Sequence, residues 1–93
     1  MQGYTAQRDE YMNRLRRIEG QVRGLQRLID EDTYCIDVLT QISAVNKALH
    51  SVAVGLLHGH LEHCVAEAAA KGGAEASAKV SEATAAVERL LKS

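Results

Sequence analysis

The sequence of 93 residues contains no proline, no tryptophan and no phenylalanine, and it has only two cysteines. Without proline the chain lacks the residue that most strongly interrupts a helix, whereas alanine, leucine and valine are plentiful. Apolar residues make up 46% of the chain but form no run long enough to span a bilayer. The composition predicts an all-α fold with long helices, in a single domain covering residues 1–93, and no membrane as a partner.

Signals for secretion and for catalysis are also missing. The first residues, Met1-Gln2-Gly3-Tyr4, lack the charged-then-apolar arrangement of a signal peptide. We therefore expect a cytoplasmic protein whose two cysteines stay reduced rather than form a disulfide. No Gly-rich phosphate loop is present, and no nucleophile is paired with a base and an orienting acid, so we do not expect an enzyme.

The net charge of −1 gives no overall sign of nucleic-acid binding, but the charges are unevenly distributed. Residues 1–30 carry six arginines and four acidic residues, a net charge of +2. Residues 31–93 carry five basic and eight acidic residues, a net charge of −3. The N-terminal third is therefore the part where we expect a polyanion to bind.

Apolar residues recur at helical spacing in three segments. They predict helices over residues 5–30 and 34–70, and a third helix through residues 76–90. The apolar rows are Leu15, Ile18, Val22, Leu25 and Ile29; Ile42, Val45, Leu49, Val52 and Leu56; and Ala76, Val80, Ala83, Val87 and Leu90. Residues 30–33 read as a turn, and Lys71-Gly72-Gly73 is typical of a helix C-terminus.

The predicted central helix is too long for a compact monomer, since it would extend over roughly 55 Å. Apolar and small residues also lie beside its main row, namely Val38, Ala44, Ala48, Ser51 and Gly55. A helix that is apolar on more than one side is buried on more than one side. The pattern therefore predicts a three-helix protomer that completes its core by oligomerising.

His60 and Cys64 form the first candidate metal site. They are four positions apart, so one helix face carries both and they could share a metal ion. The neighbouring His58 and His63 point in other directions and are not expected to be ligands. The spacing alone favours a plainer interpretation, in which the pair is one surface histidine and one buried cysteine.

Cys35, in the first turn of the central helix, adds a second thiol. It is 25 positions from His60, which is roughly 38 Å along a continuous helix. Two antiparallel copies of this helix, crossing near residue 48, would build two identical sites, each with Cys35 from one chain and His60 and Cys64 from the other. Two thiolates and one imidazole suit Cu(I), whereas structural zinc usually has four ligands. Zinc stays open on ligand chemistry, with His63 or water as its fourth ligand.

Five arginines of the first helix form a second candidate site, for DNA: Arg14, Arg16, Arg17, Arg23 and Arg27. Three of them share one helix face and the other two flank it, and arginine suits contacts with phosphate. The plainer alternative, which the pattern alone favours, is a solvated face whose charge is offset by Glu19 and Asp30. No helix-turn-helix signature is present.

Residues 14–25, 34–45 and 60–64 together resemble the CsoR/RcnR family of bacterial repressors, with a likeness from about Arg8 to Leu91. The resemblance implies an all-helical tetramer, a dimer of dimers, that binds operator DNA without a helix-turn-helix motif. For the copper-sensing branch it implies the ligands Cys35, His60 and Cys64, drawn from two protomers. It also implies that Tyr34 and Glu82 orient the ligands from outside the coordination shell.

Ligand types favour the copper branch of this family. The resemblance implies an N-terminal histidine for nickel and cobalt sensors, no histidine at position 60 for persulfide sensors and no second cysteine for formaldehyde sensors. In one respect the chain departs from some copper sensors, which have a DNA-binding arginine in the middle of the second helix. Here His50 and Ser51 lie in that region, so we expect DNA contacts from the first helix and Lys47.

Three hypotheses follow. The first is a Cu(I)-responsive repressor that leaves operator DNA when copper binds and so derepresses copper-resistance genes. The second is a thiol redox or persulfide sensor that uses Cys35 and Cys64, and the third is a helical assembly module with incidental cysteines. The partners expected under the first hypothesis are operator DNA, further copies of the chain and a copper chaperone.

Overall fold

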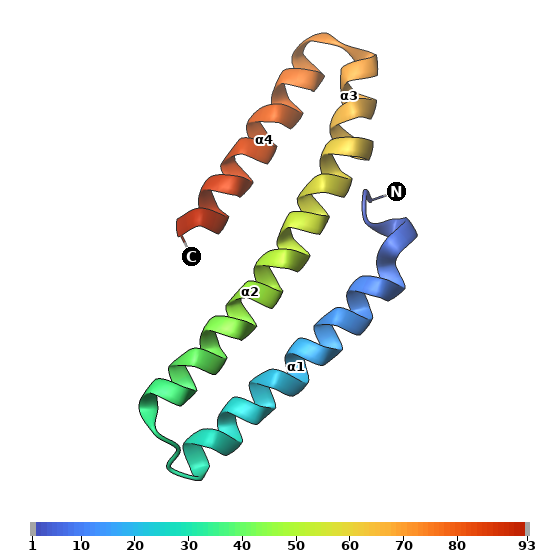
Figure 1. Ribbon diagram of the computed structural model, residues 1–93. Coiled ribbons are helices and arrows are strands. Elements are labelled where there is room, and N and C mark those ends of the chain that lie inside the picture. Colours follow the sequence, from blue (N-terminus) through green and yellow to red (C-terminus); the bar gives the residue numbers. More distant parts are fainter. Residues whose placement is uncertain (1, 93) are drawn as a thin grey trace. The chain divides into compact units, whose positions relative to one another are not determined.

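The computed structural model describes residues 2–92, and these residues are helical apart from short turns (Figure 1). The elements in chain order are the 3-10 turn η1 (Thr5–Gln7), α1 (Arg8–Asp30), α2 (Cys35–Gly59), the π-helical segment η2 (His60–Val65), α3 (Ala66–Lys71) and α4 (Gly73–Lys92). Because α2, η2 and α3 follow one another without a gap, they correspond to the single central helix that the sequence predicts. The predicted all-α fold with three helices is confirmed.

The chain forms two compact units. One contains Gln7–Val54, and the other contains the N-terminal residues up to Ala6 together with the chain from Gly55 onward. The single domain expected from the length of the chain stays a prediction. No helix within residues 2–92 is long and apolar enough to cross a membrane.

In the first unit, α1 and the first part of α2 form an antiparallel hairpin (Figure 1). The turn between them is closed by backbone hydrogen bonds, in which the N–H of Thr33 donates to the carbonyl of Leu28 at 3.0 Å and the N–H of Asp32 donates to Ile29 at 3.2 Å. Asp32 has a φ of 55°, a left-handed conformation that aspartate tolerates better than most residues. The turn predicted at residues 30–33 is therefore present.

The core of this hairpin is narrow. Ile18 packs with Val45 and Val52, and the half-buried residues around them are Tyr11, Leu25 and Ala48. Other apolar residues of the same two helices stay exposed in the single chain, namely Leu15, Val22, Ile29, Ile36, Leu39, Ile42 and Leu49. The hairpin thus buries one apolar face and leaves a second face without a partner.

Two of the small residues beside the main apolar row of α2 contact α1 of their own chain. Ala48 packs beside the Ile18 cluster, and Ser51 accepts a hydrogen bond from Arg14. Both residues therefore lie on the side of α2 that faces α1, although Ser51 stays exposed.

In the second unit, α4 packs against α3 and η2. The reversal between α3 and α4 occurs at Gly72, whose φ of 76° and ψ of 176° are almost restricted to glycine. Its N–H donates to the carbonyls of Ala68 and Ala69, both at 3.1 Å. The helix end predicted at Lys71-Gly72-Gly73 is therefore confirmed. Ala68 and Ala83 are the buried apolar residues of the two helices.

Candidate functional site

His60 and Cys64 both belong to the π-helical segment η2 and are both half-buried. A π-helix has i→i+5 hydrogen bonds, is rare, and often occurs at functional sites. A spacing of four residues is close to one turn of either helix type, so both side chains remain on one face. They line a cavity of about 430 Å³ together with residues of α3 and α4. The structure thus brings together two of the three predicted metal ligands.

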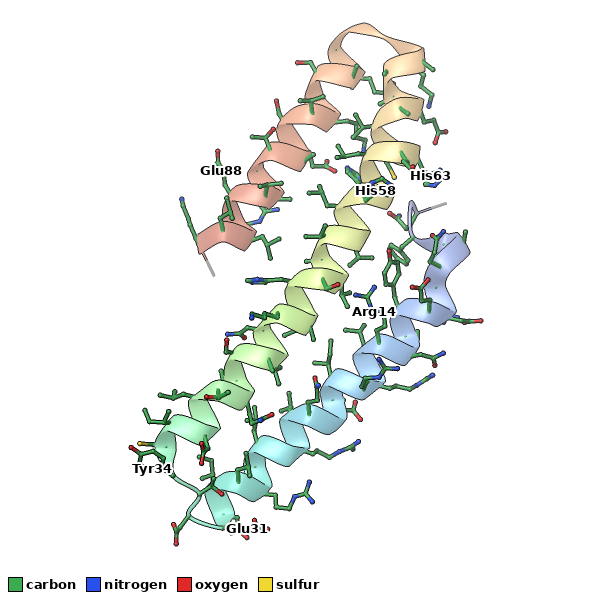
Figure 2. All side chains as sticks on the ribbon, viewed as in Figure 1. Arg14, Glu31, Tyr34, His58, His63 and Glu88 are labelled. Carbon is green, nitrogen blue, oxygen red and sulfur yellow. The ribbon has the colours of Figure 1, made fainter. Side chains whose placement is uncertain are left out.

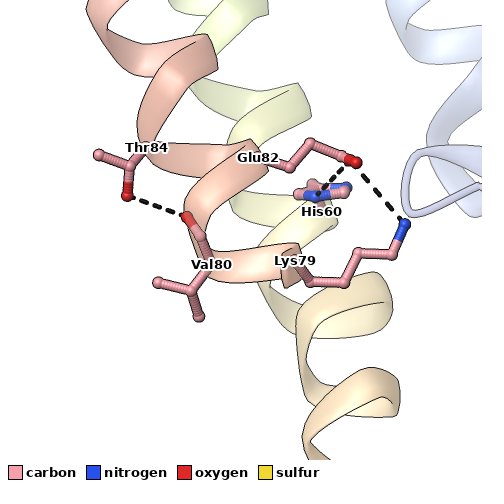
Figure 3. A network of polar contacts seen from close by, with 5 residues as sticks. All are labelled: His60, Lys79, Val80, Glu82 and Thr84. Carbon is pink, nitrogen blue, oxygen red and sulfur yellow. Dashed lines mark hydrogen bonds and ion pairs between the residues drawn. The ribbon is translucent and has the colours of Figure 1, made fainter. Parts of the chain in front are cut away.

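Glu82 of α4 lies behind His60 in the same cavity. Its Oε1 atom is 4.0 Å from His60 Nε2 and 3.8 Å from Lys79 Nζ, and Figure 3 shows the carboxylate between these two groups. With Nε2 directed at a carboxylate, Nδ1 is the imidazole nitrogen left for a metal ion. The ligand-orienting role expected for Glu82 stays a prediction.

Cys35 and Tyr34 lie elsewhere in the chain. Cys35 is the first residue of α2 and Tyr34 precedes it, and both are exposed in the unit formed by Gln7–Val54. Both cysteines are free thiols. Within residues 2–92 no three His, Cys, Asp or Glu side chains converge as a metal site.

The other two histidines of this region face a different carboxylate. His58 Nε2 is 3.1 Å from Glu62 Oε1, and His63 Nε2 is 3.8 Å from Glu62 Oε2. Both imidazoles are exposed, and neither lines the cavity that contains His60 and Cys64 (Figure 2). Our expectation that they are not ligands stays a prediction.

The N-terminal segment also reaches this cavity, which the sequence analysis did not anticipate. Gly3 is buried against Gly59, and a Cβ on Gly59 would lie 2.9 Å from the Gly3 carbonyl oxygen. This close backbone approach brings Gln2 to the cavity wall. The glycines themselves are visible in the sequence, but their pairing depends on a contact between residues 56 positions apart.

The predicted DNA-binding arginines have different surroundings. Arg14 is half-buried, donates a hydrogen bond to Ser51 Oγ at 2.6 Å and lies 5.7 Å from the centre of the Tyr11 ring (Figure 2). Arg16 donates to Asn13 at 3.0 Å, and Arg23 forms an ion pair with Glu19 at 3.3 Å. The hydrogen bond to Ser51 holds the Arg14 guanidinium against α2.

The remaining predicted cations lie on the same hairpin. Arg17 and Arg27 line an open groove of about 690 Å³ between α1 and α2. Lys47 is exposed on α2, and one turn separates it from Ser51, so it shares a helix face with the residue that holds Arg14. These positions give the hairpin positively charged groups on both of its helices.

Comparisons with known proteins agree on one family. The family model for metal-sensitive transcriptional repressors matches residues 7–89. The copper-sensing transcriptional repressor RicR of Mycobacterium tuberculosis is 63% identical over 91 residues, which cover 98% of this chain and 95% of RicR. The copper-sensing transcriptional repressor CsoR of Bacillus subtilis is 51% identical over 71 residues, covering 76% of this chain and 70% of its own.

A solved structure is similar in fold. The crystal structure of the copper-sensing repressor CsoR with Cu(I) from Geobacillus thermodenitrificans aligns with a TM-score of 0.85 and 39% identity. The alignment covers 94% of this chain and 88% of that chain. The resemblance drawn from three sequence segments is therefore confirmed over almost the whole chain.

Proposed function

This chain belongs to the family of metal-sensitive transcriptional repressors, and on that premise we propose that it is a Cu(I)-responsive repressor. The apo protein binds operator DNA, and Cu(I) binding releases it, which derepresses copper-resistance genes. The observation that carries the proposal is the shared cavity of His60 and Cys64, with Glu82 directed at His60. Members of this family are regulators of transcription rather than enzymes.

The donor atoms fit Cu(I). His60 offers an imidazole nitrogen and Cys64 a sulfur, and Cys35 offers the second sulfur as an exposed thiol at the start of α2. Soft thiolates select Cu(I), and three donors satisfy it, whereas structural zinc usually takes four. When bound, Cu(I) supplies the bonds that join these three side chains.

We propose that each copper site is built from two chains. The chain is helical at every residue from Cys35 to Lys71, and an uninterrupted helix separates Cys35 from His60 by roughly 38 Å. A second, antiparallel chain can instead supply Cys35 to the His60–Cys64 pair. Tyr34 precedes Cys35, so the same arrangement would bring its phenol ring to the site.

The exposed apolar face of the hairpin supports an oligomer of this kind. Leu15, Val22 and Ile29 recur every seven residues along α1 and are 40%, 42% and 64% exposed. Apolar rows of this length are normally covered, because burying them contributes free energy in proportion to their area. We propose that further copies of the chain cover them, in a dimer of dimers.

The DNA surface belongs to the hairpin. Arg14, Arg16, Arg17, Arg23, Arg27 and Lys47 are its candidate contacts, and phosphate groups are their natural partners. Copper bonds would join two chains and would therefore favour one relative placement of the helices that carry these cations. If this placement has a lower affinity for DNA than that of the apo protein, copper binding releases the operator. Such a repressor works in the cytoplasm, where its operator lies, and a copper chaperone stays a predicted partner.

Operator binding measured with and without Cu(I), in the presence of reductant, tests this function. We expect Cu(I) to weaken operator binding by about tenfold or more. His60→Ala should abolish this response, whereas the matched control His63→Ala, an exposed histidine three positions away, should keep it. A response that survives His60→Ala and needs an oxidant instead of copper would support the thiol sensor.

A further inference from the structure

Two lysines line the cavity that contains His60 and Cys64, and one of them touches the carboxylate that faces the imidazole. Lys79 Nζ lies 3.8 Å from Glu82 Oε1, the same oxygen that lies 4.0 Å from His60 Nε2 (Figure 3). Lys71 pairs with Glu75 at 3.8 Å, and neither of those residues forms an ion pair with His60 among the described residues. Lys79 is thus one contact away from a proposed copper ligand.

The contact between Glu82 and His60 is weak by itself. The Glu82 side chain is 61% exposed, and at 4.0 Å the pair is too long for a hydrogen bond. A glutamate has several rotamers available, and an exposed ion pair holds it only slightly. A second group on the same oxygen restricts those rotamers further, and the Lys79 side chain, at 38% exposed, is more enclosed than the Glu82 side chain at 61%.

The pair contributes little to α4 itself. Lys79 precedes Glu82 along the helix, which is the less favourable order of a basic and an acidic residue. Its effect is therefore expected at His60 rather than in the stability of the helix.

We propose that Lys79 is a positioning residue of the copper site that acts through Glu82. Its ammonium holds the carboxylate in the orientation in which Oε1 faces His60 Nε2. The negative charge on that side attracts the Nε2 edge of the ring, so that the imidazole presents Nδ1 to the cavity that Cys64 lines. Without Lys79 the carboxylate turns toward solvent and the ring loses its fixed orientation. This inference rests on the proposed function.

The test compares Lys79→Met with the matched control Lys71→Met, which removes the other lysine of the same cavity. The first measurement uses the apo protein: the ring-carbon proton resonances of His60, assigned with His60→Ala, are recorded at one fixed pH well above the usual range of histidine, so that the ring is neutral in every variant and the resonances report its orientation. We expect Lys79→Met to shift them in the same direction as Glu82→Gln does, and Lys71→Met to leave them in place. Lys79→Arg keeps the positive charge and should restore the wild-type positions.

The second measurement is the ratio of operator dissociation constants with and without Cu(I). Losing a residue that hydrogen-bonds a metal ligand typically lowers metal affinity or activity by a factor of ten to a hundred. Lys79 is one contact further from the metal, so Lys79→Met should lower this ratio by about three- to tenfold. In a Glu82→Gln background, Lys79→Met should have no further effect, because both changes act through one carboxylate.

The outcomes separate the two proposals. If the wild-type protein does not respond to Cu(I), the proposed function fails, while the apo spectra still test the contact between Lys79, Glu82 and His60. If the wild-type protein responds but Lys79→Met matches Lys71→Met in both measurements, the role of Lys79 is overturned. A full effect of Lys79→Met in the Glu82→Gln background also overturns it, since Lys79 would then act without Glu82.

Discussion

At the scale of single residues, the structure distinguishes arginines that look equivalent in the sequence. Arg23 has its charge offset by Glu19 at 3.3 Å, whereas Arg14 is held by Ser51 and the Tyr11 ring, neither of which is charged. Arg14 forms no ion pair within residues 2–92, and a guanidinium that is held in place and has its charge available is well suited to a phosphate oxygen, because less side-chain entropy is lost on binding. Arg14 is therefore the arginine to test first.

Arg14→Ala should weaken the binding of apo protein to operator DNA and leave Cu(I) affinity unchanged. Removing one phosphate contact lowers the slope of log K against log salt by about one. The measurement is a series of operator titrations at several salt concentrations.

Two controls accompany this variant. Ser51→Ala leaves the charge of Arg14 but removes its anchor, so affinity should fall while the salt slope stays the same. Arg89→Ala removes an arginine of α4 that is not among the candidate contacts, and it should change neither quantity. An unaltered slope in Arg14→Ala would remove that residue from the DNA surface.

At the scale of helices, the sequence predicted what depends on local spacing. The apolar rows that include Ile18 and Val45 predicted that both segments are helices and which face of each helix is buried, because a helix places residues three and four positions apart on one side. Gly72 could be recognised as a helix end because glycine alone tolerates its backbone conformation. The pair His60 and Cys64 was found in the same way, since four positions return a helix to one face.

What the sequence could not give depends on contacts between distant positions or on small changes in hydrogen bonding. The π-helical segment over His60–Val65 lies beyond Leu56, the last residue of the apolar row in the central helix, so that row gives no sign of it. The approach of Gly3 to Gly59 and the approach of Glu82 to His60 arise from packing between segments. Helical periodicity carries no information about either.

Gly72→Ala should lower the free energy of unfolding by about 1–3 kcal/mol, because a Cβ is strained at its φ of 76° and ψ of 176°. Chemical denaturation followed by circular dichroism measures the change. Gly20→Ala is the control: it lies inside α1, and a Cβ there meets nothing within 4 Å, so better helix propensity should keep stability equal or raise it. Equal effects of the two substitutions would contradict the strain argument.

At the scale of the whole molecule, one chain provides the parts of a copper site without assembling it. His60, Cys64 and Glu82 gather in one unit, while Cys35 and Tyr34 are exposed in the other. The apolar face of the hairpin that includes Leu15 and Val22 is likewise left uncovered. The second copy that we propose would explain both features, and it would also couple metal binding to the helices that carry the candidate DNA-binding cations.

Subunit mixing tests this account most directly. Cys35→Ala lacks one thiol, and a His60→Ala/Cys64→Ala double mutant lacks the other two ligands, so neither homo-oligomer has a complete site. After the two proteins are mixed and re-equilibrated, a mixed dimer should carry one complete site, with Cys35 from the double mutant and His60 and Cys64 from the single mutant. X-ray absorption should then show Cu(I) bound by two sulfurs and one nitrogen in the mixture and in neither parent. Mixed dimers that form, as mass spectrometry would show, but hold no such three-coordinate Cu(I) would contradict a site shared between two chains.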